Sequence, residues 1–424
     1  MRYTKEDIFR LVEEEDVEFI RLQFTDIYGN LKNMAVTSSQ LEKALDGRCR
    51  FDAASIEDYS AGSENNMYLQ PDFDTFEIFP WRPQQGKVAR LFCDVYTMDG
   101  QPYEGDPRYV LRRVLKEAAD MGYELNVGPE CEFFLFNTDE NALPTTNTNE
   151  KAGYFDCGPA DFGENARRDI VLTLEQMGFV IESSHHEKAA AQHEVDFQYD
   201  EALKTADNIQ TFKLAVKTIA KRHGLHGTFM PKPKAECNGS GMHMNMSIMT
   251  GSGKDRKNLF ADPSDELGLS KEAYYFLGGI AKHIKAITAV TNPIVNSYKR
   301  IIGNPNMIFS VPKDSEDRAR IELRSPDPSA NPYLALAVCL AAGLQGIKEQ
   351  IEPPKNVLTK CSAANGALPN TLAEAIAELE KDTLIKNTLG SVLYKNYLDV
   401  KKKEWKAYCS QVTDWETEQY LGKY

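Results

Sequence analysis

The pattern of apolar and polar residues predicts a helix and several strands in the first hundred positions. Thr4-Lys-Glu-Asp7 is typical of a helix start, and apolar residues then recur at helical spacing. Residues 18–24 alternate, with Ile20, Leu22 and Phe24 on one face, which predicts a strand. Further strands are expected at 31–36, 76–79 and 88–96. Residues 1–103 are therefore expected to form a small α+β domain.

The longer remainder mixes both kinds of element. Asp106-Pro107 is expected to open a helix. Strands are expected at 128–137, 193–198, 241–248 and 319–325. Helices are expected around 170–177, 209–219, 271–290, 331–350 and 371–403. The fold class is therefore α+β, with a second, larger α/β domain over residues 104–424.

Composition and charge exclude some classes of function. The 424 residues carry 49 Lys and Arg against 63 Asp and Glu, a formal net charge of −14, which disfavours nucleic-acid binding. The longest apolar run, Tyr333–Leu344, is too short to cross a membrane and fits a buried helix. The eight cysteines are scattered, and no signal segment precedes Ile8. We expect a cytoplasmic protein with reduced, mostly buried thiols.

Glu130 and Glu132 are the first candidate metal ligands. Residues two apart on a strand share a face, so both carboxylates should point the same way, just before the apolar run 133–136. Like charges repel, and burial opposes ionisation, so a divalent cation would relieve the arrangement. Two exposed glutamates on a solvated strand face are the alternative.

A second cluster spans residues 182–194 and contains Glu182, Glu187 and Glu194 among three histidines. Glu187 and Glu194 differ by seven positions, so an uninterrupted strand would place them on opposite faces. A bulge or bend at 189–191 would let them converge. Hard oxygen ligands favour Mg²⁺ or Mn²⁺ over zinc. A polar loop without a ligand is equally compatible with this stretch.

Two more stretches repeat the period of two. Asn238-Gly-Ser-Gly-Met-His243 allows a close backbone approach to a ligand, and His243, Asn245 and Ser247 then share one strand face. Taken alone, this is more often a simple turn. Arg320, Glu322 and Arg324 also share a face, either as a surface ion-pair ladder or as a metal ligand between phosphate-binding arginines. All four clusters together indicate Mg²⁺-dependent phosphoryl transfer.

The motifs, taken in order, resemble the type I glutamine synthetases in their shorter bacterial form. The resemblance spans nearly the whole chain. The matching motifs are Phe24-Thr-Asp26, Asp52 with Ser55-Ile56, 67–72, Gly128-Pro-Glu-Cys-Glu132, 154–156, His185-His-Glu187, Gln192-His-Glu194, Met230-Pro-Lys-Pro233, 238–243, Asn296-Ser-Tyr-Lys-Arg300, 320–327, Asn331-Pro-Tyr-Leu334 and 415–420.

The resemblance implies a β-grasp-like N-terminal domain and a catalytic domain, assembled as a dodecamer of two hexameric rings with active sites between subunits. It implies two divalent ions, Mg²⁺ or Mn²⁺, per active site. Glu132, Glu187 and Glu194 would bind one ion, and Glu130, His243 and Glu322 the other. The substrates would be glutamate, ammonium and ATP, with glutamine, ADP and phosphate as products through a γ-glutamyl phosphate.

The resemblance also implies roles for the remaining residues. The nucleotide would lie near Glu182, Asn245, Ser247 and Arg320. Glutamate would lie against Asn238, Gly239 and Arg300, with Arg324 near its reacting carboxylate. Asp52 of the adjacent subunit would bind ammonium and accept its proton, with Ser55 close by; without the resemblance, Asp52 could equally be a turn or cap residue.

The segment after Arg300 departs from the family pattern. It is shorter, lacks the flap glutamate and two motif arginines, and has Ser310 in the place of one arginine. Lys313, Arg318 and Arg320 are the candidates to substitute for the arginines, and Asn304 or Asn306 for the flap glutamate, although an amide cannot act as a base. Two alternatives to glutamine synthesis follow: a γ-glutamyl ligase for another amine, and a regulatory or binding paralogue with impaired catalysis.

Overall fold

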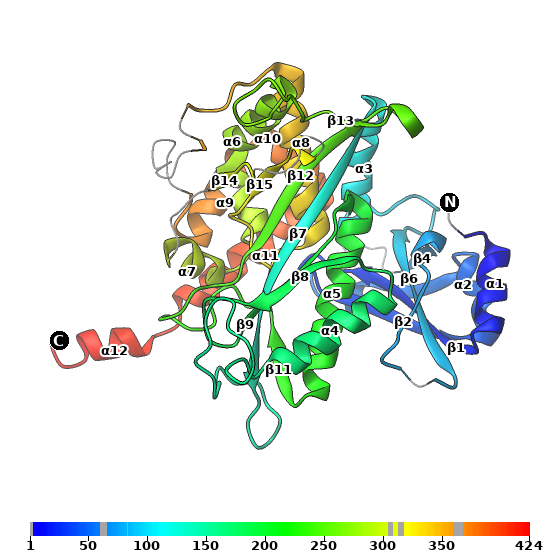
Figure 1. The fold of residues 1–424 in the computed structure, drawn as a ribbon, viewed down its shortest axis with the longest axis horizontal. Helices are drawn as coiled ribbons and strands as arrows, with labels where there is room; N and C mark the ends of the chain where they lie inside the picture. The colour runs from blue at the N-terminus through cyan, green and yellow to red at the C-terminus, as the bar shows by residue number, and fades with distance from the viewer. Residues whose placement is uncertain are drawn as a thin grey trace.

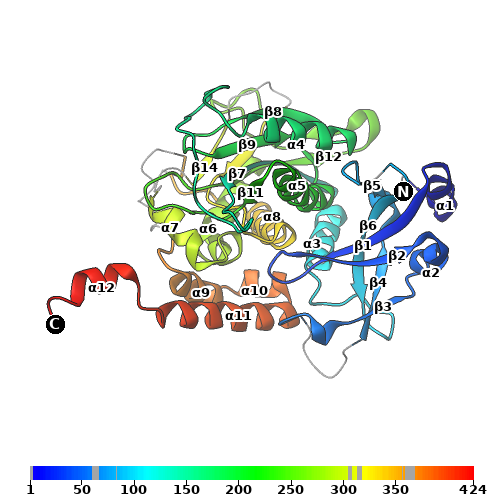
Figure 2. The same ribbon diagram turned by 90° about the horizontal axis from the view of Figure 1, so that it is seen from below.

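Two sheets organise the chain. The computed structural model describes residues 3–59, 66–82, 84–303, 308–312, 318–355, 357–358 and 368–424. One sheet has six strands and the other has nine. The smaller sheet lies to one side of the larger, and the C-terminal helix α12 (Asp414–Tyr420) projects away on the opposite side (Figures 1 and 2). Helices and sheets together confirm the α+β class.

The smaller sheet comes from the first hundred residues. Its order is β2-β1-β6-β4-β3, with β5 paired to β6, and only β1 and β6 run parallel. Its elements are α1 (Lys5–Glu14), β1 (Val17–Thr25), β2 (Leu31–Thr37), α2 (Leu41–Leu45), β3 (Cys49–Asp52), β4 (Asn66–Pro71), β5 (Glu77–Ile78) and β6 (Lys87–Tyr96). Thr4 caps α1 reciprocally with Asp7, as predicted. Ile20 and Leu22 are buried in a core that this sheet shares with α1 and α2.

The larger sheet is antiparallel throughout, in the order β14-β15-β12-β7-β9-β8. Two short strands, β10 and β11, also pair with β7, and β13 pairs with β12. The strands are β7 (Tyr123–Asn137), β8 (Ile181–His186), β9 (Gln192–Phe197), β10 (Asp200–Glu201), β11 (Leu225–Thr228), β12 (Met242–Thr250), β13 (Lys257–Asn258), β14 (Phe309–Ser310) and β15 (Ile321–Leu323). The long central strand β7 therefore has neighbours on both sides.

Helices cover one face of this sheet, with α5 and α8 directly beneath it (Figure 2). The remaining helices are α3 (Pro107–Asp120), α4 (Glu164–Gln176), α5 (Ala202–Arg222), α6 (Lys271–Thr291), α7 (Val295–Gly303), α8 (Pro332–Glu349), α9 (Leu372–Lys381), α10 (Thr383–Leu389) and α11 (Ser391–Cys409). The apolar run 333–344 lies in the buried helix α8, as expected. A Cβ atom at Gly279 of α6 would lie 2.1 Å from the Ala342 carbonyl, so glycine permits the close crossing of these helices.

Several boundaries differ from the predictions. The helix expected over 371–403 is divided into α9, α10 and α11, because Asp382 caps a new helix and Gly390 adopts a φ of +78°. The strand expected over 319–325 is shorter in the structure, where β15 comprises Ile321–Leu323. Strands β3, β4, β8, β10, β11, β13 and β14 were not predicted. None of the helices within the described ranges has the length and apolar character that a membrane crossing requires.

Candidate active site

Strand β7 presents the first pair of predicted site residues. Cys131 and Phe133 are buried against the helices beneath the sheet. Glu130 and Glu132 alternate with them, so both carboxylates lie on the opposite face, as the period of two predicted. The antiparallel register then sets His243 of β12 opposite Glu130 and Glu194 of β9 opposite Glu132.

We call Glu130, His243 and Glu322 the central cluster. The His243 Nδ1 atom lies 2.9 Å from Glu130 Oε2 and 3.4 Å from Glu322 Oε1. The Asn245 side-chain amide donates a hydrogen bond of 2.8 Å to Glu130 Oε1, and Arg324 forms an ion pair with Glu322. The three predicted ligands thus come from three neighbouring strands, with their ligand atoms within 4.8 Å of one another.

We call His185, Glu187 and Glu194 the edge cluster. The His185 Nε2 atom lies 3.2 Å from Glu187 Oε1 and 3.3 Å from Glu194 Oε2. The two glutamates converge because the chain bends back over residues 188–191 between β8 and β9, which confirms the bend expected at 189–191. His185 was missed as a member of this cluster. The antiparallel pairing that places it opposite Glu194 was the missing information.

Glu132 lies on the same face as both clusters, next to the glycine-rich turn. Its Oε2 atom accepts hydrogen bonds from the Gln192 amide at 2.9 Å and from the Gly241 N–H at 2.8 Å. Burial raises the pKa of Glu132, and the Glu187 carboxylate adds to this shift. The predicted trio of Glu132, Glu187 and Glu194 is therefore electrostatically coupled.

The titration of the edge cluster reflects crowded negative charge. Burial raises the pKa of Glu194 to about 9, and the nearby Asp196 and Glu132 carboxylates reinforce the shift. Hydrogen bonds to Glu187 and Glu194 raise the pKa of His185 to about 10. The crowding of carboxylates in the metal-free cluster thus favours bound protons. A bound divalent cation would supply the positive charge that these protons provide.

A cavity of about 270 Å³ lies beside the central cluster. All four residues predicted to contact the nucleotide line it, namely Glu182, Asn245, Ser247 and Arg320. The Arg320 Nε atom donates a hydrogen bond of 3.1 Å to Asn245 Oδ1, which connects this cavity to Glu130 through the same amide. Tyr199 and Phe197 also line the cavity, and sequence reasoning did not single them out.

The glycine-rich turn packs against Arg300. A Cβ atom at Gly239 would lie 2.4 Å from the Pro231 carbonyl oxygen, and one at Gly241 would lie 2.6 Å from Arg300 Nη2. Arg300 is buried and donates hydrogen bonds to the Ser325 and Arg324 carbonyl oxygens at 2.8 and 3.1 Å. Asn238 and Gly239 precede β12 at this turn. A side chain at Gly239 or Gly241 would collide with these atoms, so both positions require glycine.

Asp52 and Ser55 stand apart from this group. They belong to the smaller sheet, where Asp52 ends β3 and caps the short turn that follows. The Asp52 carboxylate accepts hydrogen bonds from the Ala54 N–H at 3.0 Å and the Ser55 hydroxyl at 2.9 Å. Within one chain, the described contacts of Asp52 fit the cap interpretation and connect it with neither cluster.

A buried triad of Glu150, His186 and His193 lies near the edge cluster and was not predicted. His186 Nε2 lies 2.8 Å from Glu150 Oε1, and the Arg167 guanidinium lies 2.8 Å from His193 Nδ1. Because a guanidinium bonds to His193, positive charge is already present there. We interpret the triad as a support for the β8–β9 hairpin.

The shortened segment after Arg300 is described in part. Ser310 lies on β14, directly opposite the central-cluster residue Glu322 in the register of β15. Arg318 lines the 270 Å³ cavity. Asn304, Asn306 and Lys313, the other proposed substitutes, lie outside the described residues.

Comparison with known proteins decides the family. A family model described as the glutamine synthetase catalytic domain matches residues 104–420, and the glutamine synthetase β-grasp domain matches residues 16–98. The chain belongs to the glutamine synthetase family. Its relatives include the glutamine synthetase of Clostridium saccharobutylicum, 55% identical with all of both chains covered. That of Staphylococcus aureus strain Mu50 is 50% identical over all of this chain and 99% of the relative.

Solved structures agree with this assignment. A chain described as GmaS without ligand has a TM-score of 0.88 at 33% identity, covering 98% of this chain and 99% of that one. The Plasmodium falciparum glutamine synthetase shares the fold, with a TM-score of 0.87 at 24% identity. Alignment with the Clostridium relative runs over 445 positions against 424 residues here, which accords with a shortened segment.

Membership in this family defines the activity. The chain is a glutamate–ammonia ligase that joins ammonium to the γ-carboxylate of glutamate at the expense of ATP. Like other glutamine synthetases, it uses ATP and divalent metal ions. The family models and the two curated relatives favour glutamine synthesis over both alternatives raised by the sequence, another acceptor amine and a non-catalytic paralogue.

Proposed function

We propose that the two clusters bind two divalent cations, Mg²⁺ or Mn²⁺, in each active site. Glu130, His243 and Glu322 are assigned to one ion. Glu132, Glu187 and Glu194 are assigned to the other. The observation that carries this proposal is the concentration of buried and half-buried carboxylates on one sheet face, where burial raises the pKa of Glu194. The donor set of carboxylate oxygens and one imidazole fits both metals.

His185 then acts as a positioning residue. Its Nε2 atom contacts both Glu187 and Glu194, so it holds the two carboxylates together. Gln192 and the Gly241 N–H do the same for Glu132. Metal ions in such a site neutralise charge that builds up on a transferring phosphoryl group. The protein's contribution is to fix the ligands on paired strands before the substrates arrive.

The substrates are assigned to the two sides of this metal site. The nucleotide occupies the 270 Å³ cavity, with Asn245 and Ser247 on one wall and Glu182 and Arg320 on the others. Glutamate lies at the turn of Asn238 and Gly239, against Arg300. This order places the γ-carboxylate between the nucleotide and Arg324, which already contacts the central cluster through Glu322.

Two steps follow from this placement. The γ-carboxylate attacks the terminal phosphorus of ATP, and ADP leaves. Ammonia then attacks the γ-glutamyl phosphate and phosphate leaves. Arg324 and Arg320 supply positive charge for the phosphoryl oxygens. Arg300 orients the substrate, and its own position is fixed by the carbonyls of Ser325 and Arg324.

Ammonium requires a base that removes one proton, and we assign this role to Asp52 of a neighbouring subunit, with Ser55 beside it. The support is that Asp52 and Ser55 are exposed in the single chain and contact neither cluster, although the family motif includes them. This assignment requires assembly, and we infer a dodecamer of two hexameric rings in the cytoplasm. We assign residues 1–103 and 104–424 to the two domains.

Metal binding tests the ligand assignment. Manganese titration followed by electron paramagnetic resonance should give two bound Mn²⁺ per chain. Glu130→Ala and Glu187→Ala should each remove one ion. Glu124→Ala is the matched control, because Glu124 is an exposed residue of the same strand β7 outside both clusters. A single ion per chain, or unchanged binding in either variant, would contradict the assignment.

Mixed assemblies test the shared active site. Asp52→Ala and Glu132→Ala chains should each be inactive alone. Co-assembled chains should regain ammonium-dependent turnover, because some sites then combine an intact Asp52 with an intact metal site. Mixtures that stay inactive, while both variants form the same assembly, would contradict a role for Asp52 across the interface.

A further inference from the structure

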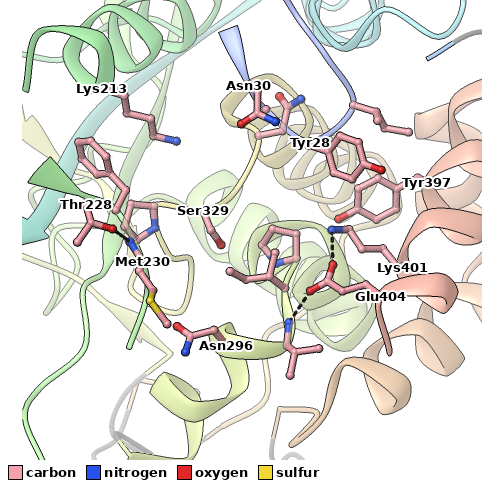
Figure 3. Close-up of a pocket in the computed structure, with 18 of the residues that line it drawn as sticks. Tyr28, Asn30, Lys213, Thr228, Met230, Asn296, Ser329, Tyr397, Lys401 and Glu404 are labelled. Atoms are coloured by element: carbon pink, nitrogen blue, oxygen red, sulfur yellow. Dashed lines mark hydrogen bonds and ion pairs between the residues drawn. The ribbon is translucent and has the colours of Figure 1, made fainter. Parts of the chain in front are cut away.

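A second, larger cavity of about 640 Å³ lies away from the two metal clusters. It is lined by the turn between β1 and β2, by α5 and β11, by the start of α7 and by α11 (Figure 3). The segment 230–232 and Asn296 separate it from the glycine-rich turn. Asn296 accepts a hydrogen bond of 2.7 Å from the Lys232 N–H and donates one of 3.0 Å to the Lys232 carbonyl oxygen.

The wall of this cavity carries an excess of positive charge. Four lysines line it, namely Lys213, Lys217, Lys299 and Lys401. Glu404 is the one carboxylate among the described residues that line it, and it is already engaged. Its two oxygens accept hydrogen bonds from the Lys401 ammonium at 3.1 Å and from the Val295 N–H at 2.9 Å. Three lysines thus remain without a carboxylate within 4.0 Å in the described part of the chain.

Aromatic rings, and not carboxylates, lie next to the ammonium groups of these three lysines. The Lys213 and Lys217 ammonium groups lie 6.0 and 5.8 Å from the centre of the Phe229 ring. Lys299 lies 5.7 Å from the Tyr408 ring, and Lys401 lies over Tyr28 and Tyr397. Such contacts orient an ammonium group and attract it weakly, but they leave its charge unneutralised.

The inner part of the cavity is poorly solvated. Burial lowers the pKa of Lys213 to about 8, and the neighbouring Lys217 contributes to this shift. The buried Asp327 carboxylate also acts electrostatically on Lys213, and it is engaged by the Ser329 hydroxyl and by the Asn292 amide at 2.9 Å. In Figure 3 the Lys213 ammonium group and the Ser329 hydroxyl face the same space.

Neutral polar groups complete the lining. Asn30, Thr228, Asn296 and Ser329 are distributed around the cavity (Figure 3). Amides and hydroxyls can donate hydrogen bonds to the oxygens of a bound anion. Lysines on separate walls can contact separate anionic groups of one molecule. The lining thus combines several cations, several neutral donors and aromatic faces.

We propose that this cavity binds a small organic anion that carries two or more carboxylate or phosphate groups. The proposal goes beyond the glutamine-forming reaction, because none of the residues assigned to that reaction lines the cavity. Lys213 and Lys217 on one wall and Lys299 on another provide the charge. Thr228 and Asn296 provide neutral hydrogen-bond donors.

Calorimetric titration of the assembled protein tests the proposal. Mg²⁺, ADP and glutamate are kept at saturating concentration so that the reaction site is occupied. Tricarballylate serves as the carboxylate probe and phosphonoacetate as the phosphonate probe. At least one should bind, and the stronger one identifies the preferred anionic group. Absence of heat from both probes up to about 10 mM would overturn the proposal.

Variants locate the binding. The double variant Lys213→Met, Lys217→Met should raise the dissociation constant of the probe at least about tenfold, since two charged donors are lost. Lys221→Met is the matched control, because Lys221 is an exposed residue of the same helix α5 that does not line the cavity. If the double variant fails to assemble, Lys299→Met on helix α7 should also weaken binding of the probe. Equal affinity in wild type and in every assembled lysine variant would overturn the proposal.

Discussion

The edge cluster and the lysine-lined cavity concentrate charge of opposite sign by different means. Glu194 and His185 lie on paired strands, so the backbone register fixes them side by side. Lys213 and Lys217 extend from one turn of α5 to the next, and Lys299 and Lys401 come from other helices. Short side chains on strands suit the fixed geometry of a metal ion. Long, flexible lysines suit an anion of less defined shape.

The two regions respond to crowding in the same physical way. In each, burial favours the neutral form of the side chain, which raises the pKa of Glu194 to about 9 and lowers that of Lys213 to about 8. A ligand of opposite charge would reverse both shifts. The comparison teaches that ligand sites can be recognised by charge that the folded chain itself leaves incompletely paired.

The largest expected effect comes from Glu194→Gln. An amide has nearly the shape of the protonated glutamic acid that prevails below pH 9, so the metal-free protein should keep its thermal stability. Because the amide cannot provide a carboxylate ligand, kcat/KM for glutamine formation should fall at least about 100-fold. Parallel melting curves and steady-state assays check both parts. Full activity in this variant would remove Glu194 from the metal site.

Metal affinity should depend on pH because the ion replaces the Glu194 proton. Below pH 9 that proton must leave, so the apparent affinity for Mn²⁺ should rise between pH 7 and pH 9, by up to about tenfold per unit. Calorimetry in buffers of different ionisation enthalpy measures the released protons. Glu194→Gln should lose this component, and a flat wild-type profile would contradict it.

Gly239→Ala should weaken glutamate binding by steric crowding. The added methyl would lie 2.4 Å from the Pro231 carbonyl and 3.0 Å from Arg300 Cγ, so the turn and the arginine must separate. We expect the KM for glutamate to rise about tenfold, with a smaller change in that for ATP. Gly422→Ala is the control, because a Cβ atom there meets nothing within 4 Å.

The smallest expected effect is a gain in stability from Lys213→Met. Burial lowers the pKa of Lys213 in the folded protein to about 8, below the ordinary 10.5 of the unfolded chain. The unfolded chain therefore binds more protons than the folded chain between these two pH values. Burial of the charged lysine thus opposes folding most fully below pH 8. The variant should melt about 1–3 °C higher at pH 7. This difference should shrink as pH rises from 8 to 10.5. Lys221→Met should not show it, and a lower melting point for Lys213→Met would contradict the sign.

The sequence predicted the parts of the site that depend on local periodicity. Glu130 and Glu132 share a face because β7 is regular, and the same holds for His243 and Asn245 on β12. The bend at 189–191 that brings Glu187 and Glu194 together was predicted, but the pairing of β8 with β9 was not, because pairing between two short polar strands leaves no periodic signal. The membership of His185 was missed for the same reason.

The periodicity of the sequence did not predict the helix breaks or the contacts between residues that are far apart in the chain. Residues 371–403 are uniformly helical in character, and the breaks at Asp382 and Gly390 depend on single residues. The lysines of the large cavity span positions 213 to 401, so only the folded chain brings them together. The β-grasp and catalytic architecture, by contrast, came from the resemblance of ordered motifs and not from periodicity.

The central claim is that this chain makes glutamine with the described metal clusters despite its shortened segment after Arg300. The most direct test measures ADP release from ATP and glutamate with Mg²⁺, with and without ammonium, in wild type, Glu132→Ala and the control Glu124→Ala. We predict ammonium-stimulated release, with one glutamine per ADP, that persists in Glu124→Ala and disappears in Glu132→Ala. ADP release indifferent to ammonium, or no turnover in a wild-type protein that binds nucleotide, would contradict the claim.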